Sequence, residues 1–308
     1  MSRRPTYLRV VAWTGCPMRC PYCHKEGDSA VGNGRDNPSS DVLIRCLEAA
    51  HLAGIQKFKL LGGEPLARPD LPVVVAHLRA AAPTADISLI TSGAVAPGRA
   101  VAALAAGMDR INVSIHGWTP QAFALRGGTA HRARQRATLL DLLDQRGLRP
   151  KLNYVYTGSG DHEDLAELLR WLRDRRATLS VLDDLNDPLA SAQSIVALLR
   201  RLLGPWVTQE QEEDPHSLPT TILRFVDGLR VEVKSAQLGA YAPWGMCSTC
   251  PFRSDCREGT FALRLTADGR LLPCMHRPDQ AIDLAAVAKE SVQTAANAMD
   301  GWITGLLR

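Results

Sequence analysis

The chain has 308 residues, with 36 basic and 32 acidic side chains and a formal net charge of +4. Its hydrophobic share of 45% and charged share of 22% exclude a fibrous or largely disordered chain, and the small net charge gives no support to nucleic-acid binding. No apolar run reaches the roughly 18 residues of a membrane-spanning helix. The basic N-terminus is not followed by the apolar core and cleavage site of a signal peptide, so we expect none. We therefore expect a cytoplasmic globular protein without membrane or nucleic-acid partners.

The first two thirds of the chain alternate short strand patterns with longer helical ones. The strands are expected at Tyr7–Trp13, Lys57–Leu61, Ile87–Ile90, Arg110–Ile115, Lys151–Tyr156 and Leu179–Leu182. The helices are expected at Asp41–Ala53, Leu71–Ala81, Ala96–Ala106, Ala130–Arg146, Asp164–Arg175 and Ser191–Leu203. Such alternation indicates βαβ units and a parallel sheet. We predict an α/β fold with a partial (βα)6 barrel, because a complete barrel of this type has eight units.

The remaining third is predicted to be a smaller, β-rich unit. The polar, acidic stretch Thr208–Pro215 is typical of a linker. Three short antiparallel strands are expected after it, at Thr220–Arg224, Leu229–Val233 and Phe261–Thr266, with a hairpin turn at Ala267–Arg270. We therefore expect a core domain over residues 1–210 and a second domain over residues 211–308.

The cysteines fall into two clusters, one in each expected domain. The clusters are Cys16, Cys20 and Cys23 near the start, and Cys247, Cys250, Cys256 and Cys274 near the end. Clustered cysteines in a cytoplasmic chain predict metal binding rather than disulfides. Cys46 stands alone in an amphipathic helical pattern, and we expect it to be a buried core residue without chemistry.

The first cluster has the spacing Cys-x3-Cys-x2-Cys, directly after the first predicted strand. This is neither the ferredoxin spacing nor the paired spacing of zinc sites. Zinc stays an alternative, since a tetrahedral site could form if His24 joined the three thiolates. The motif resembles that of the radical S-adenosylmethionine (SAM) superfamily, in which three cysteines hold a 4Fe-4S cluster and the fourth iron binds SAM.

This resemblance implies roles for residues outside the cysteine motif. Tyr22 matches an aromatic that contacts the adenine of SAM, Gly62-Gly63-Glu64 matches a motif that binds the methionyl amino group, and Ser114 matches a further SAM contact. By themselves, Gly-Gly-Glu-Pro is an ordinary turn and Ser114 a buried strand end. The implied chemistry is reductive cleavage of SAM to methionine and a 5′-deoxyadenosyl radical, which abstracts hydrogen from a bound substrate.

The second cluster surrounds the predicted hairpin and offers four thiolates, enough for an iron–sulfur cluster or a zinc ion without another ligand. The segment Leu263–Cys274 resembles the C-terminal domain of the GTP 3′,8-cyclase family, and the resemblance extends over nearly the whole chain. It implies substrate contacts at Arg9, Lys59, Thr91, Lys151 and Arg264. Basic side chains that converge at strand ends suit an anionic, phosphate-bearing substrate, although each could equally be a surface cation.

Three departures separate the chain from that family. Three cysteines hold the second cluster of the cyclases, whereas Cys256 adds a fourth candidate here, in a pattern that resembles the SPASM/twitch auxiliary-cluster domains of peptide-modifying radical SAM enzymes. Ala262 stands where the cyclases have a second active-site arginine, and Gly301–Arg308 lacks their terminal glycine pair. We expect an auxiliary 4Fe-4S cluster and chemistry other than GTP cyclisation.

The sequence thus predicts a radical SAM enzyme that acts on an anionic small molecule, a nucleotide or nucleoside, in cofactor or natural-product biosynthesis. An external electron donor such as flavodoxin or ferredoxin is implied. Two alternatives remain: a maturase of a ribosomally made peptide, favoured by the four-cysteine pattern, and a non-catalytic zinc-binding module. The intact Gly62-Gly63-Glu64 speaks against the zinc module.

Overall fold

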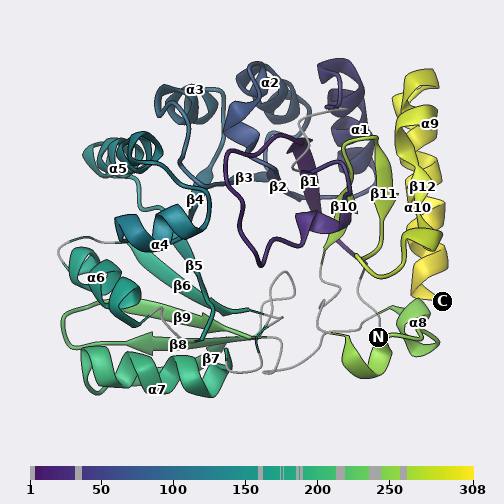
Figure 1. Cartoon of the computed structure of the whole chain (residues 1–308). Coiled ribbons are helices and arrows are strands. Elements are labelled where there is room, and N and C mark those ends of the chain that lie inside the picture. Colours follow the sequence, from purple (N-terminus) through teal and green to yellow (C-terminus); the bar gives the residue numbers. More distant parts are fainter. Residues whose placement is uncertain are drawn as a thin grey trace.

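The structure, a computed structural model, describes residues 4–31, 37–158, 162–173, 175, 177–184, 187, 190–212, 219–235, 244–256 and 262–308. The described strands form one twelve-stranded sheet in the order β12-β11-β10-β1-β2-β3-β4-β5-β6-β9-β8-β7. The sheet curves, and its strands follow the chain order through the central part (Figure 1).

The six central strands are parallel and confirm the predicted partial (βα)6 barrel. They are β1 (Tyr7–Trp13), β2 (Lys57–Gly62), β3 (Asp86–Thr91), β4 (Arg110–Ile115), β5 (Lys151–Tyr156) and β6 (Thr178–Asp183). The expected helices are present as α1 (Ser40–Leu52), α2 (Leu71–Ala81), α3 (Gly98–Ala105), α5 (Ala130–Gln145), α6 (His162–Leu172) and α7 (Ala192–Leu203), and a short α4 (Pro120–Leu125) was not expected. Helices α1, α2, α3 and α5 lie along the outer side of the curved sheet (Figure 1).

One expectation for the region after α7, the linker, is wrong, and the antiparallel strands expected after it are present but join the barrel sheet. Thr208–Glu212 forms β7 rather than a linker, while residues 213–215 lie outside the described residues. β8 (Thr220–Arg224) and β9 (Arg230–Lys234) do not belong to a separate sheet, because β9 pairs in parallel with β6 and the barrel sheet continues through β8 to β7. All five residues of β7 are exposed, and a solvated edge strand needs no apolar side chains, so its sequence looks like a linker. The boundary expected at residue 210 falls inside this strand.

The C-terminal segment extends the sheet at its other edge. β10 (Leu263–Leu265) pairs in parallel with β1, and β11 (Arg270–Leu272) and β12 (Ile282–Asp283) follow it. Helices α9 (Leu284–Glu290) and α10 (Val292–Leu307), which the sequence analysis did not anticipate, pack against α1, and α8 (Gly245–Ser248) contacts α10. Among the described residues, no helix combines the length and apolarity needed to cross a membrane.

The two faces of the strands differ in character. Leu8 and Val10 belong to the apolar core, and so do Phe58 and Leu60. Because successive side chains of a strand point to opposite faces, Arg9 and the other polar residues between such core positions face the concave side. The charged residues of this face include Arg9, Lys59, Lys151, Glu232 and Arg264. A complete barrel of this class fills its interior with packed apolar side chains, so this charged interior indicates a place for a ligand.

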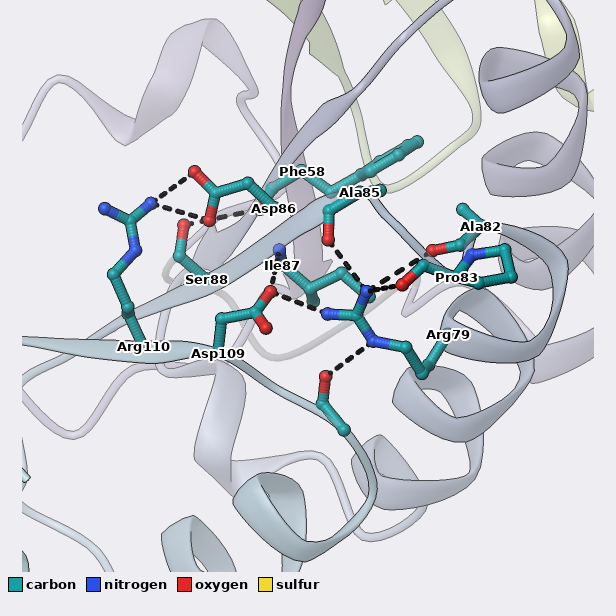
Figure 2. A network of polar contacts seen from close by, with 11 residues as sticks. Phe58, Arg79, Ala82, Pro83, Ala85, Asp86, Ile87, Ser88, Asp109 and Arg110 are labelled. Atoms are coloured by element: carbon teal, nitrogen blue, oxygen red, sulfur yellow. Dashed lines mark hydrogen bonds and ion pairs between the residues drawn. The ribbon is translucent and has the colours of Figure 1, made fainter.

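A network of polar contacts around Arg79 holds the amino ends of β3 and β4 together (Figure 2). Arg79 of α2 donates to the carbonyls of Ala85 (2.8 Å), Pro83 (2.9 Å) and Gly107 (3.0 Å) and to the carboxylate of Asp109 (2.6 Å). Asp109 also accepts a hydrogen bond from the Ile87 amide at 2.7 Å. This network joins α2 to the starts of β3 and β4, so it supports the fold at the end remote from the carboxyl ends of the strands.

Candidate functional site

The three clustered cysteines lie on the long loop between β1 and α1, which runs inside the curve of the sheet (Figure 1). The Met18 amide lies 3.4 Å from the Cys16 sulfur, and the Cys23 amide donates to the Cys20 carbonyl at 3.2 Å. Cys16 and Cys20 pack against Met18, Ala94 and Phe123, whereas Cys23 is exposed. The loop therefore has a turned backbone with an apolar anchor on one side and an accessible thiol on the other.

Cys16 and Cys20 lie close enough to the other thiols of the loop to be influenced by their charges. Burial raises the pKa of Cys16 to about 11 and of Cys20 to about 12, and the charges of neighbouring thiols add to both shifts. None of the eight cysteines, all of them in described segments, is in a disulfide.

No three metal-binding side chains of the described segments converge on the position of a single ion. A 4Fe-4S cluster is held by thiolates at separate irons, so its ligands surround a larger volume. The three thiols of the cysteine loop are the type of ligand that holds a 4Fe-4S cluster.

Gly63 lets the end of β2 pack directly on the start of the cysteine loop. Its amide donates to the Trp13 carbonyl at 2.7 Å, and the next amide, of Glu64, donates to the Gly15 carbonyl at 2.8 Å. A Cβ atom at Gly63 would lie 2.3 Å from the Gly15 oxygen, so only glycine allows this close approach. The Gly-Gly-Glu motif therefore positions the cysteine loop through its backbone.

The Glu64 carboxylate is fully buried and is already bound by the protein. One oxygen accepts from the Thr91 hydroxyl at 2.6 Å and the Leu66 amide at 3.1 Å, and the other accepts from the amide of Ser92 at 2.8 Å and from its hydroxyl. Burial raises the pKa of Glu64, and these hydrogen bonds oppose the shift. The geometry joins the ends of β2 and β3, so it gives no support to Glu64 as the partner of the SAM ammonium or to Thr91 as a substrate contact.

Tyr22 and Ser114 lie at the carboxyl end of β4. The Tyr22 hydroxyl is 2.8 Å from Nδ1 of His116, and the two rings are stacked with centroids 6.0 Å apart. Burial lowers the pKa of His116 to about 3, with smaller effects from Arg136 and Arg126, so this imidazole is neutral at physiological pH. Arg126 lies 5.9 Å from the Tyr22 ring centroid. Ser114, on β4 itself, is partly buried.

The predicted substrate cations gather on the concave face, but three of them, Arg9, Arg264 and Lys151, are paired with carboxylates. Arg264, Arg9 and Lys59 are register neighbours across β10, β1 and β2. Arg9 donates to both oxygens of Glu26, one of them at 2.8 Å, and Lys151 forms an ion pair with Glu232. Both carboxylates are buried.

The second cysteine cluster lies in a compact segment beside the C-terminal hairpin. Cys247 and Cys274 are buried, and Cys250 and Cys256 are partly buried. Phe252, between Cys250 and Cys256, stacks on His276 with a centroid distance of 5.5 Å. This contact brings the loop that carries three of the cysteines to the segment that carries the fourth.

One loop connects the two cysteine regions. Asp28, five residues after Cys23, accepts a hydrogen bond from the Ala267 amide in the β10–β11 turn at 2.6 Å. Val31 packs with Ala267 and with Val11 of β1. The C-terminal hairpin is therefore fixed to the loop that carries the first cysteine cluster.

Sequence reasoning missed three residues of this region: Glu26, Glu232 and His116. His116 had a signal, because it directly follows β4, and side chains at the carboxyl ends of barrel strands line active sites. Glu232 lies between two core valines of β9. Because side chains alternate between the two faces of a strand, this pattern could have predicted that Glu232 faces the concave side. Glu26 lies in an irregular loop, where no periodicity predicts its direction.

Residues 10–172, more than half of the chain, match the family model described as the radical SAM superfamily. The chain belongs to this superfamily. It is an enzyme, and the cofactors of the family are a 4Fe-4S cluster and SAM.

Curated relatives narrow the similarity. The chain is 29% identical to a GTP 3′,8-cyclase of Streptomyces coelicolor over 94% of its own length and 82% of the relative's. It is 26% identical to a probable GTP 3′,8-cyclase of Thermoplasma volcanium over 92% of its length and 84% of the relative's. These similarities confirm the resemblance to the GTP 3′,8-cyclase family that was stated from the sequence motifs.

Solved structures confirm the fold. SuiB of Streptococcus suis bound to S-adenosylmethionine aligns with 96% of this chain at a TM-score of 0.60 and 12% identity, and the alignment covers 66% of the SuiB chain, slightly less than two thirds. The structure described as native anSMEcpe with bound AdoMet aligns with 97% of this chain and 82% of its own at a TM-score of 0.61 and 16% identity. At such identities, the likeness establishes the fold alone.

Proposed function

We propose that the enzyme cleaves SAM reductively and abstracts hydrogen from an anionic small molecule, a nucleotide or nucleoside, bound on the concave face of the sheet. The observation that carries the proposal is the juxtaposition of the cysteine loop with a concave face that bears Arg9, Lys59, Lys151 and Arg264. Relatives named GTP 3′,8-cyclase support a nucleotide-like substrate.

In this proposal Cys16, Cys20 and Cys23 hold the SAM-binding cluster, and Tyr22 and Ser114 lie where the cofactor would bind. When bound, the cluster and SAM supply a 5′-deoxyadenosyl radical by one-electron reduction. The chain's own residues orient the substrate: Lys59 and Lys151 attract negative charge, and the backbone at Gly62-Gly63 keeps the cysteine loop in place. An external electron donor such as flavodoxin or ferredoxin would supply the electron.

The second cysteine cluster would hold an auxiliary 4Fe-4S cluster. Cys247, Cys250, Cys256 and Cys274 are proposed as its ligands, which would leave no iron open to the substrate. The same four-cysteine pattern favours a second candidate function, modification of a ribosomally made peptide. The charged concave face favours the small anionic substrate.

The test is an anaerobic assay with dithionite, SAM and candidate substrates deuterated at carbon. The proposal expects 5′-deoxyadenosine to form and to carry deuterium when a nucleotide or nucleoside is present. Formation of 5′-deoxyadenosine without deuterium from any of them, but with transfer from a peptide, would favour the maturase. No 5′-deoxyadenosine from a protein with full iron and sulfide would refute the proposed function.

A further inference from the structure

Glu26 places a buried carboxylate between two of the proposed substrate cations. It follows the cysteine motif by three residues, and its residue exposure is 8%. Arg9 donates to both of its oxygens, and Nε of Arg264 lies 3.5 Å from Oε2. A guanidinium that donates twice to a carboxylate has the geometry with which arginine also takes a carboxylate or phosphate of a ligand.

The backbone holds this carboxylate in its place. Lys25 and Glu26 have φ of 53° and 54°, the left-handed region that non-glycine residues rarely occupy. The Glu26 amide donates to Nδ1 of His24 at 3.1 Å, and Asp28 is fixed to the Ala267 amide. Such strain persists only where the surroundings determine it, and it concentrates at functional sites.

The charges around Glu26 favour the ionised form of its carboxyl group. Burial would raise the pKa of Glu26, but Arg9, His24 and Arg264 outweigh it and hold the pKa well below its usual range. On the other side of the concave face, Glu232 pairs with Lys151 and lies 3.1 Å from Arg230. The positive charge available to a substrate is therefore smaller than the number of cations suggests.

We infer that Glu26 is a specificity-determining residue, which fills the anion position between Arg9 and Arg264 with the chain's own carboxylate. This inference rests on the proposed function and narrows its substrate class: the site accepts a nucleoside or a nucleoside monophosphate and rejects a triphosphate. The rejection arises because a polyphosphate near Arg9 and Arg264 meets a fixed like charge. Lys151 is paired with Glu232, so Lys59 is the proposed substrate cation that is left to attract a ligand of low charge.

The test compares binding of guanosine, GMP and GTP to the anaerobically reconstituted enzyme by calorimetry. We expect the wild type to bind GMP at least about tenfold more tightly than it binds GTP. The affinity for GTP should increase by at least about tenfold in Glu26→Gln. Glu290→Gln, an exposed change on α9, should behave as the wild type. A wild type that binds GTP more tightly than GMP overturns the inference, whatever the variant does.

Glu26→Gln leaves two guanidinium groups without their carboxylate, so its folding needs a separate readout. Thermal unfolding with inorganic tripolyphosphate provides it, since a ligand of the native state raises Tm. The anion should raise the Tm of Glu26→Gln more than that of the wild type, and an equal rise contradicts the inference. Formation of 5′-deoxyadenosine tests the proposed function independently, so the two can fail separately.

Discussion

At the scale of single residues, the concave face is governed by how its charges are balanced. Arg9 and Lys151 have carboxylate partners, whereas Lys59 lies 5.6 Å from the centroid of the Tyr7 ring. Burial, followed by the charges of Arg9, Arg110 and Lys151, lowers the pKa of Lys59 to about 7. The charge of Lys59 therefore changes near neutral pH.

Lys59→Met should stabilise the protein in a pH-dependent manner. The unfolded chain keeps a proton on Lys59 up to a pKa of ~10.4, whereas the folded chain loses it near 7. The free energy of unfolding of the wild type should therefore rise as the pH increases from about 7 to ~10.4. Below pH 7 the folded protein bears the full cost of the buried Lys59 charge. The gain from Lys59→Met, measured by urea unfolding of the cluster-free protein, should be largest at pH 6 and shrink by pH 9. A gain independent of pH would contradict the shifted pKa.

Glu64→Gln separates a structural role from a direct SAM contact. The amide cannot accept from all four donors now bound by the carboxylate, so we expect a loss of about 1–3 kcal/mol in the free energy of unfolding without SAM present. Thr91→Val, which removes the hydrogen bond of 2.6 Å to Glu64, should show a similar loss. Weaker SAM binding with unchanged unfolding would instead assign the carboxylate to the ligand.

At the scale of helices and strands, most of the barrel was predictable. β1, β4 and β5 have the expected bounds, because apolar strands that alternate with amphipathic helices leave a periodic signal. β7 could not be predicted, since its Thr-Gln-Glu-Gln-Glu sequence has no apolar face. The substrate cations were found through family resemblance, but Glu26 was missed because its position depends on a loop with left-handed backbone.

Arg79→Ala should destabilise the fold and leave the site intact. The variant removes the five hydrogen bonds of Arg79, which tie α2 to the segments that lead into β3 and β4 (Figure 2). We expect a loss of about 2–3 kcal/mol in the free energy of unfolding. Exposed Arg134 of α5 provides the control, since Arg134→Ala should be nearly neutral. Unchanged Tm for Arg79→Ala would show that the network contributes little.

At the scale of the whole molecule, two cysteine regions far apart in sequence are joined through one sheet. β10 pairs with β1, and Asp28 of the first cysteine loop binds the hairpin that precedes Cys274. The sequence predicted both cysteine regions but not their connection, because that depends on long-range pairing. The arrangement would place an auxiliary cluster and the SAM-binding cluster around the same substrate.

Cys256→Ala tests how many thiolates hold the auxiliary cluster. With four ligands, the variant should lose or destabilise auxiliary iron and retain the SAM-binding cluster. Electron paramagnetic resonance and iron analysis would measure the content of both clusters. Cys46→Ala, which changes a buried cysteine of α1 outside both cysteine clusters, is the control. A full iron complement in Cys256→Ala would show that three cysteines suffice.

If each cysteine region holds its own 4Fe-4S cluster, the content of iron and acid-labile sulfide tests this arrangement most directly. The protein is reconstituted anaerobically as wild type, as a variant with Cys16, Cys20 and Cys23 changed to alanine, and as one with Cys247, Cys250 and Cys274 changed. We predict two clusters in the wild type and about half that content in each variant, with 5′-deoxyadenosine formation abolished when the first three cysteines are removed. Zinc without sulfide in the wild type, or unchanged SAM cleavage after loss of the first three cysteines, would contradict the assignment of one 4Fe-4S cluster to each cysteine region.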